Sequence, residues 1–557
     1  MKKSLSLLLA VVMLLGLIVS AQASEKPDTW IADRVIQIQA YVDDIGYSLP
    51  DDQLNTPVMQ ELARRTGMKI EFLYTPGEKD RYVLAAQLST GNLPDMIVSY
   101  LNNSTRPEFP ILYKAATEGM FTNLAPYLAG TKVYSKYLDK DYLPADSYSN
   151  ITWRSDFNGA AYFMHLSVDA VDTSTQWDPQ REFVGGLYIQ RSIAEDLGID
   201  VTKVNTSQAL YELMVKIAEK GYKDVNGNTV TPLGPKYWGG SADALQYIIN
   251  DLTWGVSGKY NITPEGKVLH EAETDYVYKK IEYIRKLLNE GLMHKEFFTM
   301  DSTRAKELCE NKSVAIIADI HSYVDLIYGS DDWLPLGPIV DYTGNIKRVT
   351  TGKTGSGQWS IPATTKNPEE IVKLMDYLST YEGQLLCLYG VEGVSYDMVD
   401  GKPVLKEEVL TAMRNGDQKT LLNKYGAAFD NSAHYGMAYL LTDLQNKEYF
   451  GEVRPGANSG SMFTRAVELA TKYPREYRRV TGLDASAYLT ELEDVNTAMS
   501  LLDYNEMFVQ AVFATDWAKV ESIVEGFRAQ LKAAGIEKFE ALVEEKYKEN
   551  PATIKFY

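Results

Sequence analysis

Residues 357–383 read GQWSIPATTKNPEEIVKLMDYLSTYEG, and this stretch predicts a short strand that leads into a helix. Trp359 starts the apolar strand after a Gly-rich run. Asn367 is placed to cap the helix, Pro368 suits its first position, and two glutamates then complement the helix dipole. The apolar positions that follow repeat at helical spacing and predict a core face: Ile371, Leu374, Met375 and Leu378.

The same alternation of strand and helix fills the N-terminal part of the chain. Strands are predicted at residues 34–42, 68–74 and 95–100, and helices at 56–67 and 80–91. A β-α-β-α-β order requires crossovers, so it indicates a mainly parallel sheet with helices on both faces. Ligands of such sheets bind beyond the carboxyl ends of the strands. The polar residues at those ends are therefore candidate ligand contacts: Asp43, Asp44, Tyr100, Asn102 and Asn103.

Length and charge exclude some functions. The chain has 557 residues, of which 45% are hydrophobic; this length fits three or four domains of about 150 residues each, or two large lobes. Its formal net charge is −19, and a nucleic-acid role is not expected because phosphate binding needs a basic face.

The N-terminus has the pattern of a signal peptide. Lys2 and Lys3 precede an apolar run over residues 5–19, and Ala21-Gln22-Ala23 matches a small-x-small cleavage site. We expect an exported protein cleaved after Ala23; an uncleaved anchor is the alternative. Cys309 and Cys387, the two cysteines, are expected to be buried free thiols, although export permits a disulfide.

Several segments together resemble the bacterial extracellular solute-binding proteins of ABC importers. The segments are STGNLPDMIV, GMFTNLAPYL, DFNGAAYFMHLS, GGLYIQRSIAEDLGID, NEGLMHKEFFTMD, NKSVAIIADIHSY and IPATTKNPEEIVKLMDYLSTYEGQLLCLYGVEGVSYDM. They run in order from about residue 53 to about residue 398. The large carbohydrate-binding members of the family, including those for oligosaccharides, are the most similar branch.

The resemblance implies an α/β protein with the two-lobed, type II periplasmic-binding-protein-like fold. Mainly parallel sheets flanked by helices would be joined by crossover hinge strands. The N-terminal lobe would comprise residues 24–155 and 315–385. The C-terminal lobe would comprise residues 156–314 and 386–557.

A carbohydrate site needs flat aromatic rings and planar polar side chains, since sugars present C–H faces and hydroxyl edges. Trp residues predicted in crossovers or strand-end loops are the aromatic candidates: Trp153, Trp238, Trp254, Trp333 and Trp359. Trp359 could instead pack within the hinge. The further candidates are His165, Asp319, His321 and Tyr396, of which His165 could equally be structural.

A metal site is not expected. Asp224, Asn226 and Asn228 alternate as in a calcium loop, but positions six and twelve hold Thr229 and Pro235. An Asn-Gly turn in a hairpin explains this stretch better.

These observations favour a binding protein over an enzyme. We expect a monomer that captures a carbohydrate between its lobes and docks on a membrane permease, without a cofactor. A peptide or another polar solute is an alternative ligand. An exported carbohydrate-active enzyme is the other alternative, although nucleophile-elbow, P-loop and paired-Cys motifs are absent from the sequence.

Overall fold

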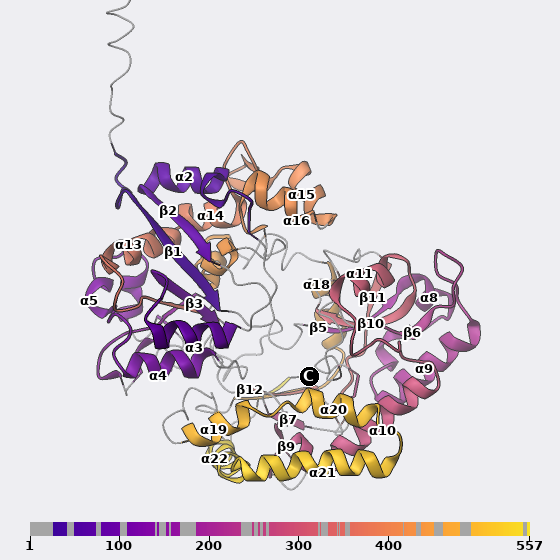
Figure 1. Ribbon diagram of the computed structural model, residues 1–557. Helices are drawn as coiled ribbons and strands as arrows, with labels where there is room; N and C mark the ends of the chain where they lie inside the picture. Colours follow the sequence, from indigo (N-terminus) through magenta and orange to yellow (C-terminus); the bar gives the residue numbers. More distant parts are fainter. Residues whose placement is uncertain are drawn as a thin grey trace, which may run out of the picture.

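A computed structural model gives the structure of the chain (Figure 1). It describes residues 26–41, 49–73, 80–100, 108–139, 142–143, 152–154, 157–166, 185–234, 245, 248–249, 254–256, 260–262, 267–320, 324, 332–341, 344, 346–350, 357–415, 417–429, 436–450, 461–479, 492–549 and 554–556. The described elements gather into two lobes, one at the upper left of Figure 1 and the other at its right and bottom.

The first lobe contains a five-stranded sheet with the order β2-β1-β3-β13-β4. Its strands are β1 (Arg34–Tyr41), β2 (Met68–Leu73), β3 (Met96–Tyr100), β13 (Gly357–Ser360) and β4 (Met164–His165). The first three are parallel, as the β-α-β-α-β pattern predicts. Strand β13 joins them antiparallel and carries β4 on its far side.

Helices cover both faces of this sheet. They are α2 (Pro57–Thr66), α3 (Asp80–Thr90), α4 (Glu108–Thr117), α5 (Ala125–Leu128), α13 (Pro368–Leu378), α14 (Tyr381–Tyr389), α15 (Glu407–Arg414), α16 (Gln418–Thr420) and α17 (Asp443–Phe450). The core on one face is shared with α2, α13 and α14, and the core on the other face with α3 and α4. A hairpin of β14 (Tyr396–Val399) and β15 (Lys402–Leu405) belongs to the same lobe.

Local sequence signals set the helix ends. Thr56 accepts a hydrogen bond from the backbone N–H of Met59, and Pro57 occupies the first helical position of α2. Gly67 ends α2 at a φ of 77°, a conformation that favours glycine. At α13 Asn367 occupies the N-cap position and Pro368 the first turn, as predicted, but the Asn367 side chain makes no capping hydrogen bond, and its amide donates to Glu370 instead.

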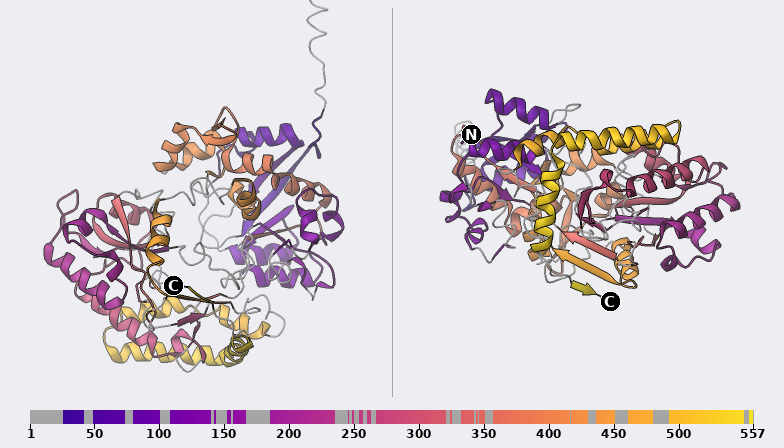
Figure 2. Two further views of the ribbon diagram at one scale, coloured as in Figure 1. Left: turned by 180° about the vertical axis from the view of Figure 1, so that it is seen from behind. Right: turned by 90° about the horizontal axis from the view of Figure 1, so that it is seen from below.

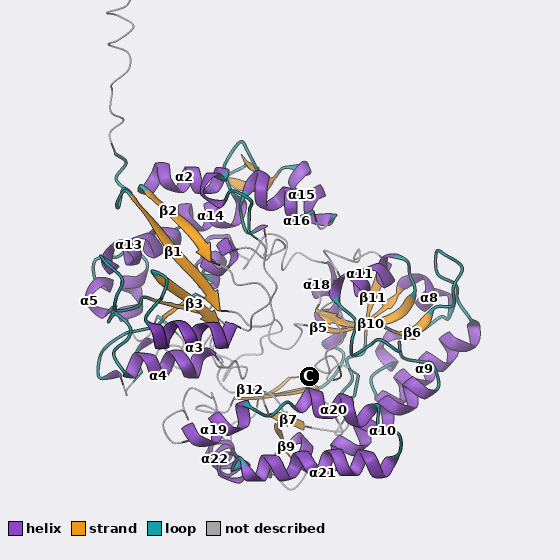
Figure 3. Cartoon of the chain, in the orientation of Figure 1, coloured by secondary structure: helices purple, strands orange, loops and turns teal. Residues whose placement is uncertain are grey.

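The second lobe is built on a four-stranded sheet with the order β11-β5-β10-β6. Its strands are β5 (Gly185–Gln190), β6 (Thr231–Leu233), β10 (Val314–Ile320) and β11 (Trp333–Leu336). Strand β5 is antiparallel to both neighbours, whereas β10 and β6 are parallel. Each lobe therefore contains a mixed sheet flanked by helices. Figure 3 shows this arrangement, with helices and strands in different colours.

Nine described helices surround this second core: α8 (Arg191–Asp196), α9 (Ser207–Lys220), α10 (Tyr276–Asn289), α11 (Ser302–Glu310), α18 (Ser461–Ala470), α19 (Glu493–Ser500), α20 (Tyr504–Val512), α21 (Trp517–Ala533) and α22 (Ile536–Glu549). Figure 2 shows the long helix α21 from below. Two small sheets complete the lobe: β7 (Trp254–Val256), β8 (Tyr260–Ile262) and β9 (Val268–His270), and β12 (Ile346–Thr350), β16 (Arg475–Arg479) and β17 (Ile554–Phe556).

The predicted lobe boundaries differ from these cores at three places. Phe157, Phe163 and strand β4 belong to the first lobe, although the prediction starts the C-terminal lobe at residue 156. Strands β10 and β11 hydrogen-bond to β5 in the second sheet, so the chain does not return to the first lobe at residue 315. Apolar residues between Leu386 and Leu441 pack in the first core, although the sequence placed them in the other lobe. Pairing and packing between segments far apart in the sequence determine these boundaries, and local sequence patterns do not show which distant segments pair.

Both cysteines are buried free thiols, as expected. Cys387 lies in the first core and Cys309 in the second, so they cannot form a disulfide with one another in this structure. In the described part of the chain, no helix is both long enough and apolar enough to cross a bilayer.

Candidate functional site

The chain passes between the lobes where strands of the two sheets begin or end. It leaves the first sheet at Leu166, beside β4, and enters the second at Gly185 of β5. It returns between Thr350 of β12 and Gly357 of β13, and it passes a third time between α17 and α18. The arrowheads of β1 and β2 point toward the middle of Figure 1, where the lobes face each other. These facing sheet edges are the candidate functional site.

A row of buried polar side chains crosses the first sheet at this edge. Ser99, Gln358 and His165 are neighbours in register on β3, β13 and β4, and each is at most 1% exposed. Residues directly opposite each other on paired strands share a face of the sheet. The amide Nε2 of Gln358 donates to Ser99 Oγ at 2.8 Å, and Thr152 Oγ1 lies 3.0 Å from His165 Nδ1.

The polar row continues to the first strand. Gln87 of α3 donates from Nε2 to Gln39 Oε1 at 3.2 Å, and its own carbonyl oxygen accepts a hydrogen bond from the Tyr41 hydroxyl. Polar contacts therefore hold this end of the sheet, whereas its opposite face is packed with apolar side chains.

His165 is neutral in this environment. Its side chain is fully buried, and burial lowers its pKa to about 3. At physiological pH the imidazole therefore carries a single N–H, and its two ring nitrogens have different hydrogen-bonding roles.

Trp359 corrects a prediction from the sequence. Its indole is fully buried in the core of the first lobe, opposite the face that carries the polar row. The indole Nε1 donates to the Tyr134 hydroxyl at 3.0 Å, and the two rings meet edge to face at 5.5 Å. Since β13 is covered by helices on this face, Trp359 packs the hinge and cannot offer a ring to a ligand in this structure.

Two other aromatic candidates are also buried. Trp333 is 1% exposed and packs beside Tyr188 and Val324 in the second lobe. Tyr396 is 3% exposed, and its ring lies against Tyr389 at 5.9 Å. Neither position can contact a ligand without a rearrangement of the core, so the structure corrects both assignments.

Trp153 and Asp319 remain at the facing edges. Trp153 is partly buried against the apolar core of the first lobe, and its indole N–H donates to the Tyr137 carbonyl at 2.8 Å. Asp319 is buried on β10, opposite Gly186 at the start of β5. Each lobe thus contributes one predicted residue near the place where the chain crosses.

The remaining candidates cannot be placed. Asp43, Asp44, Asn102, Asn103, Trp238 and His321 lie outside the described residues. For Tyr100 and Trp254 the structure gives only the strand in which each lies, namely β3 and β7.

Sequence reasoning missed Ser99, Gln358 and Thr152. Gln358 and Ser360 alternate with apolar residues in β13, and this alternation is the available signal that one face of the strand is polar. Their partners lie in distant segments, so the row itself requires the fold.

The loop at Asp224 is a hairpin turn, as its sequence suggests. Lys223 and Thr229 form an antiparallel bridge around it. The Asp224 carboxylate accepts hydrogen bonds from the backbone N–H of Asn226 and Asn228, and from the side chains of Asn228 and Ser313. Hydrogen-bond donors of the chain thus occupy the carboxylate oxygens that a calcium ion would need, so the loop does not fit calcium.

No cluster of three or more His, Cys, Asp or Glu side chains suited to a metal occurs among the described residues.

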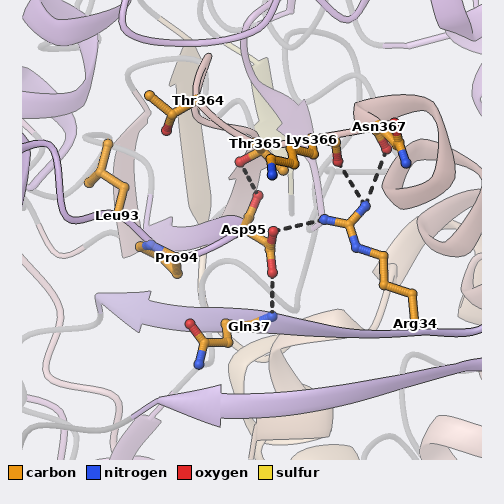
Figure 4. Close-up of a pocket in the computed structure, with 9 residues that line it drawn as sticks. All are labelled: Arg34, Gln37, Leu93, Pro94, Asp95, Thr364, Thr365, Lys366 and Asn367. Atoms are coloured by element: carbon orange, nitrogen blue, oxygen red, sulfur yellow. Dashed lines mark hydrogen bonds and ion pairs between the residues drawn. The ribbon is translucent and has the colours of Figure 1, made fainter.

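A pocket of about 400 Å³ lies at the other end of the first sheet (Figure 4). Asp95 is at its centre, bonded to Arg34 at 2.8 Å and to the backbone N–H of Gln37 at 2.9 Å. Arg34 also bonds the Lys366 carbonyl and Glu370. These contacts join β1, β3 and α13, so the pocket is part of the scaffold and lies away from the facing edges.

Comparisons with known proteins identify relatives along most of the chain. The family described as bacterial extracellular solute-binding protein matches residues 47–385. Lipoprotein LipO of Bacillus subtilis (strain 168) is 23% identical over 467 residues, which are 81% of either chain. The polygalacturonan/rhamnogalacturonan-binding protein YtcQ of the same organism is 23% identical over 369 residues, 63% of this chain and 65% of that one.

Solved structures share the fold. The alginate-binding protein AlgQ2, in a crystal structure without calcium ion, matches with a TM-score of 0.64 at 18% sequence identity. The match covers 94% of this chain and 100% of the other. At this identity the likeness concerns the two-lobed architecture alone.

Proposed function

The chain belongs to the bacterial extracellular solute-binding proteins, and on that premise we propose that it captures a carbohydrate between its lobes for an ABC importer. The observation that carries the choice of ligand is the nature of its relatives: YtcQ and AlgQ2 are named for binding polysaccharides. We propose an oligosaccharide ligand, a monomeric protein, and docking of the closed form on a membrane permease.

In this proposal the lobes are the units that close. The first lobe takes its core from the sheet of β1 and β13, and the second from the sheet of β5 and β10. Trp153 is the described candidate for ligand contact, and it supplies an aromatic surface for the C–H face of a sugar. Asp319 is fully buried, so its carboxylate could meet a sugar hydroxyl only after a rearrangement of the second lobe.

The protein performs no chemistry on its ligand in this proposal, and it is exported with its leader removed after Ala23. The N-terminal sequence supports export, because basic residues are followed by an apolar run and then by small residues, as in a signal peptide.

Titration with defined trisaccharides tests the proposal. Purified protein is titrated calorimetrically with trigalacturonate, an alginate trisaccharide and maltotriose, and the sugar is then recovered and chromatographed. We expect one sugar per chain with unchanged sugar recovered. Shortened products would indicate an enzyme, and binding of none of the three, with retention of a peptide pool instead, would contradict a carbohydrate ligand.

A further inference from the structure

The two strands that lead to the other lobe lie side by side and share their last hydrogen bond. The Leu166 backbone N–H donates to the Gly357 carbonyl at 2.9 Å, at the point where β4 and β13 meet their connections to the second lobe. Gly357 has no Cβ, and one built there would lie 3.4 Å from Leu166 Cβ. Movement of one lobe against the other must therefore act on this strand pair.

The next pair of residues along these strands is His165 and Gln358. Both side chains are fully buried on the same face of the sheet. His165 Nε2 and Gln358 Oε1 have no hydrogen-bond partner among the described residues. A buried polar atom without a partner costs about 1–3 kcal/mol, so two such atoms on paired residues require an explanation.

The two atoms are complementary. Thr152 can donate its hydroxyl hydrogen to His165 Nδ1, which leaves the ring proton on Nε2 as a donor. Gln358 uses its NH₂ group on Ser99, so its Oε1 is an acceptor. Burial also keeps the imidazole neutral, which preserves the single N–H that this arrangement needs.

We propose that His165 and Gln358 are a hinge pair: they are unbonded in this conformation and form an Nε2–H···Oε1 hydrogen bond when the lobes close. The pair positions the lobes without contacting the ligand, and it biases the protein toward the closed state because the bond exists only there. The proposal rests on the proposed function, since it concerns the closure that accompanies binding.

Four variants separate this role from simple packing. His165→Asn keeps a polar atom near Thr152 but removes the donor at the Nε2 position, whereas His165→Gln restores an N–H there. Gln358→Met is nearly isosteric and removes the acceptor. Ser360→Ala is the matched control, because Ser360 lies on the same strand and face, is fully buried, and has an Oγ without a partner among the described residues, but it faces Ile97 of β3.

The readouts are affinity for the trisaccharides and single-molecule FRET. Dyes are attached to cysteines introduced at Tyr82 and Leu501, which are exposed on opposite lobes, while Cys309 and Cys387 are buried. His165→Asn and Gln358→Met should each weaken affinity about fivefold and lower the closed fraction. Combined, they should weaken affinity no further, since both remove the same bond. His165→Gln and Ser360→Ala should resemble the wild type.

Additive losses in the double variant, or a His165→Gln protein as weak as His165→Asn, would overturn the proposal. A lower melting temperature with unchanged affinity would do the same and would indicate packing alone. If the wild type binds none of the sugars, the proposed function fails instead. The closed fractions of the ligand-free variants then decide on the hinge pair, and equal fractions in all of them would refute it.

Discussion

Trp359 illustrates at the scale of one residue how neighbouring glycines can mislead. Glycines before the ring suggested open space around it, but β13 lies in the sheet with helices on both sides. The ring is fully buried and its N–H is bonded to Tyr134, so its role is to fix β13 against the core.

Trp359→Ala should therefore lower the free energy of unfolding by about 3–5 kcal/mol, because it leaves a large cavity in the core. Trp359→Phe should cost less, since it keeps most of the apolar surface and loses the bond to Tyr134. Urea unfolding measures both. For Trp359→Phe we expect sugar affinity within about twofold of the wild type; a tenfold loss with normal stability would restore Trp359 to the binding site.

Trp153 should behave in the opposite way. It is partly exposed at the margin of the apolar core of the first lobe, and removal of an aromatic surface that contacts a sugar costs about 1–2 kcal/mol in binding, or roughly tenfold in dissociation constant. Trp153→Ala is compared by calorimetric titration with Trp517→Ala, which removes an exposed Trp from the start of α21. Equal affinities of the two variants would exclude Trp153 from the site.

At the scale of elements, a pair of carboxyl groups joins α22 to the second lobe. Glu540 of α22 is 7% exposed and accepts a hydrogen bond from the backbone N–H of His270 at 2.6 Å. Burial, together with a hydrogen bond to Glu273, raises the pKa of Glu540 to about 8. The second Glu273 oxygen is buried without a partner among the described residues. The contact thus depends on a proton held on Glu540.

The sign of the pH effect follows from this raised pKa. An unfolded Glu ionises near pH 4.5, whereas folded Glu540 keeps its proton to about pH 8. Its contribution to stability therefore falls as the pH rises between these values and is constant outside them. In melts at pH 5, 6.5 and 8, Glu540→Gln should gain stability relative to the wild type as the pH rises. Glu545→Gln, which removes an exposed carboxylate from the same helix, is the control and should show no such trend.

The Asp224 hairpin predicts that calcium has little effect on stability. Its carboxylate already accepts hydrogen bonds from Asn226, Asn228 and Ser313, so removal of calcium should not change the stability of the loop. The melting temperature should be the same in chelator and in millimolar calcium. A clear rise with calcium would mean that the ion binds the native state, because such a ligand adds stability. Ser313→Ala should destabilise the protein in both conditions.

Some elements could be predicted from the sequence and others could not, for physical reasons. The three parallel strands and the ends of α2 follow from alternation, capping and proline signals that are local. The placement of β10 beside β5, and of His165 beside Gln358, depends on pairing between distant segments. Of the Trp residues predicted in crossovers or strand-end loops, Trp359 and Trp333 lie in the apolar cores, whereas Trp153 is only partly buried. The local sequence around a Trp does not distinguish a core position from a partly exposed one.

At the scale of the whole molecule, two lobes with separate cores are connected by three passages of the chain. The cores of the first lobe contain residues from both ends of the family-matched segment, and the second core includes the C-terminal helices α20 to α22. Each lobe has its own sheet and its own buried helices, so we expect that each can unfold without the other. A ligand held between them would make their unfolding cooperative.

Scanning calorimetry can test this coupling. Without ligand we expect a broad or two-step transition, because each lobe has its own sheet and buried core and three passages of the chain connect them. A bound sugar that contacts both lobes should merge the steps into one sharper transition at higher temperature. At a concentration of 100 times the dissociation constant, the added stability should be about 2.7 kcal/mol. If the sugar raised the transition temperature of only one of the two steps, it would be bound to one lobe alone. Capture by closure of the lobes would then be the wrong description of binding.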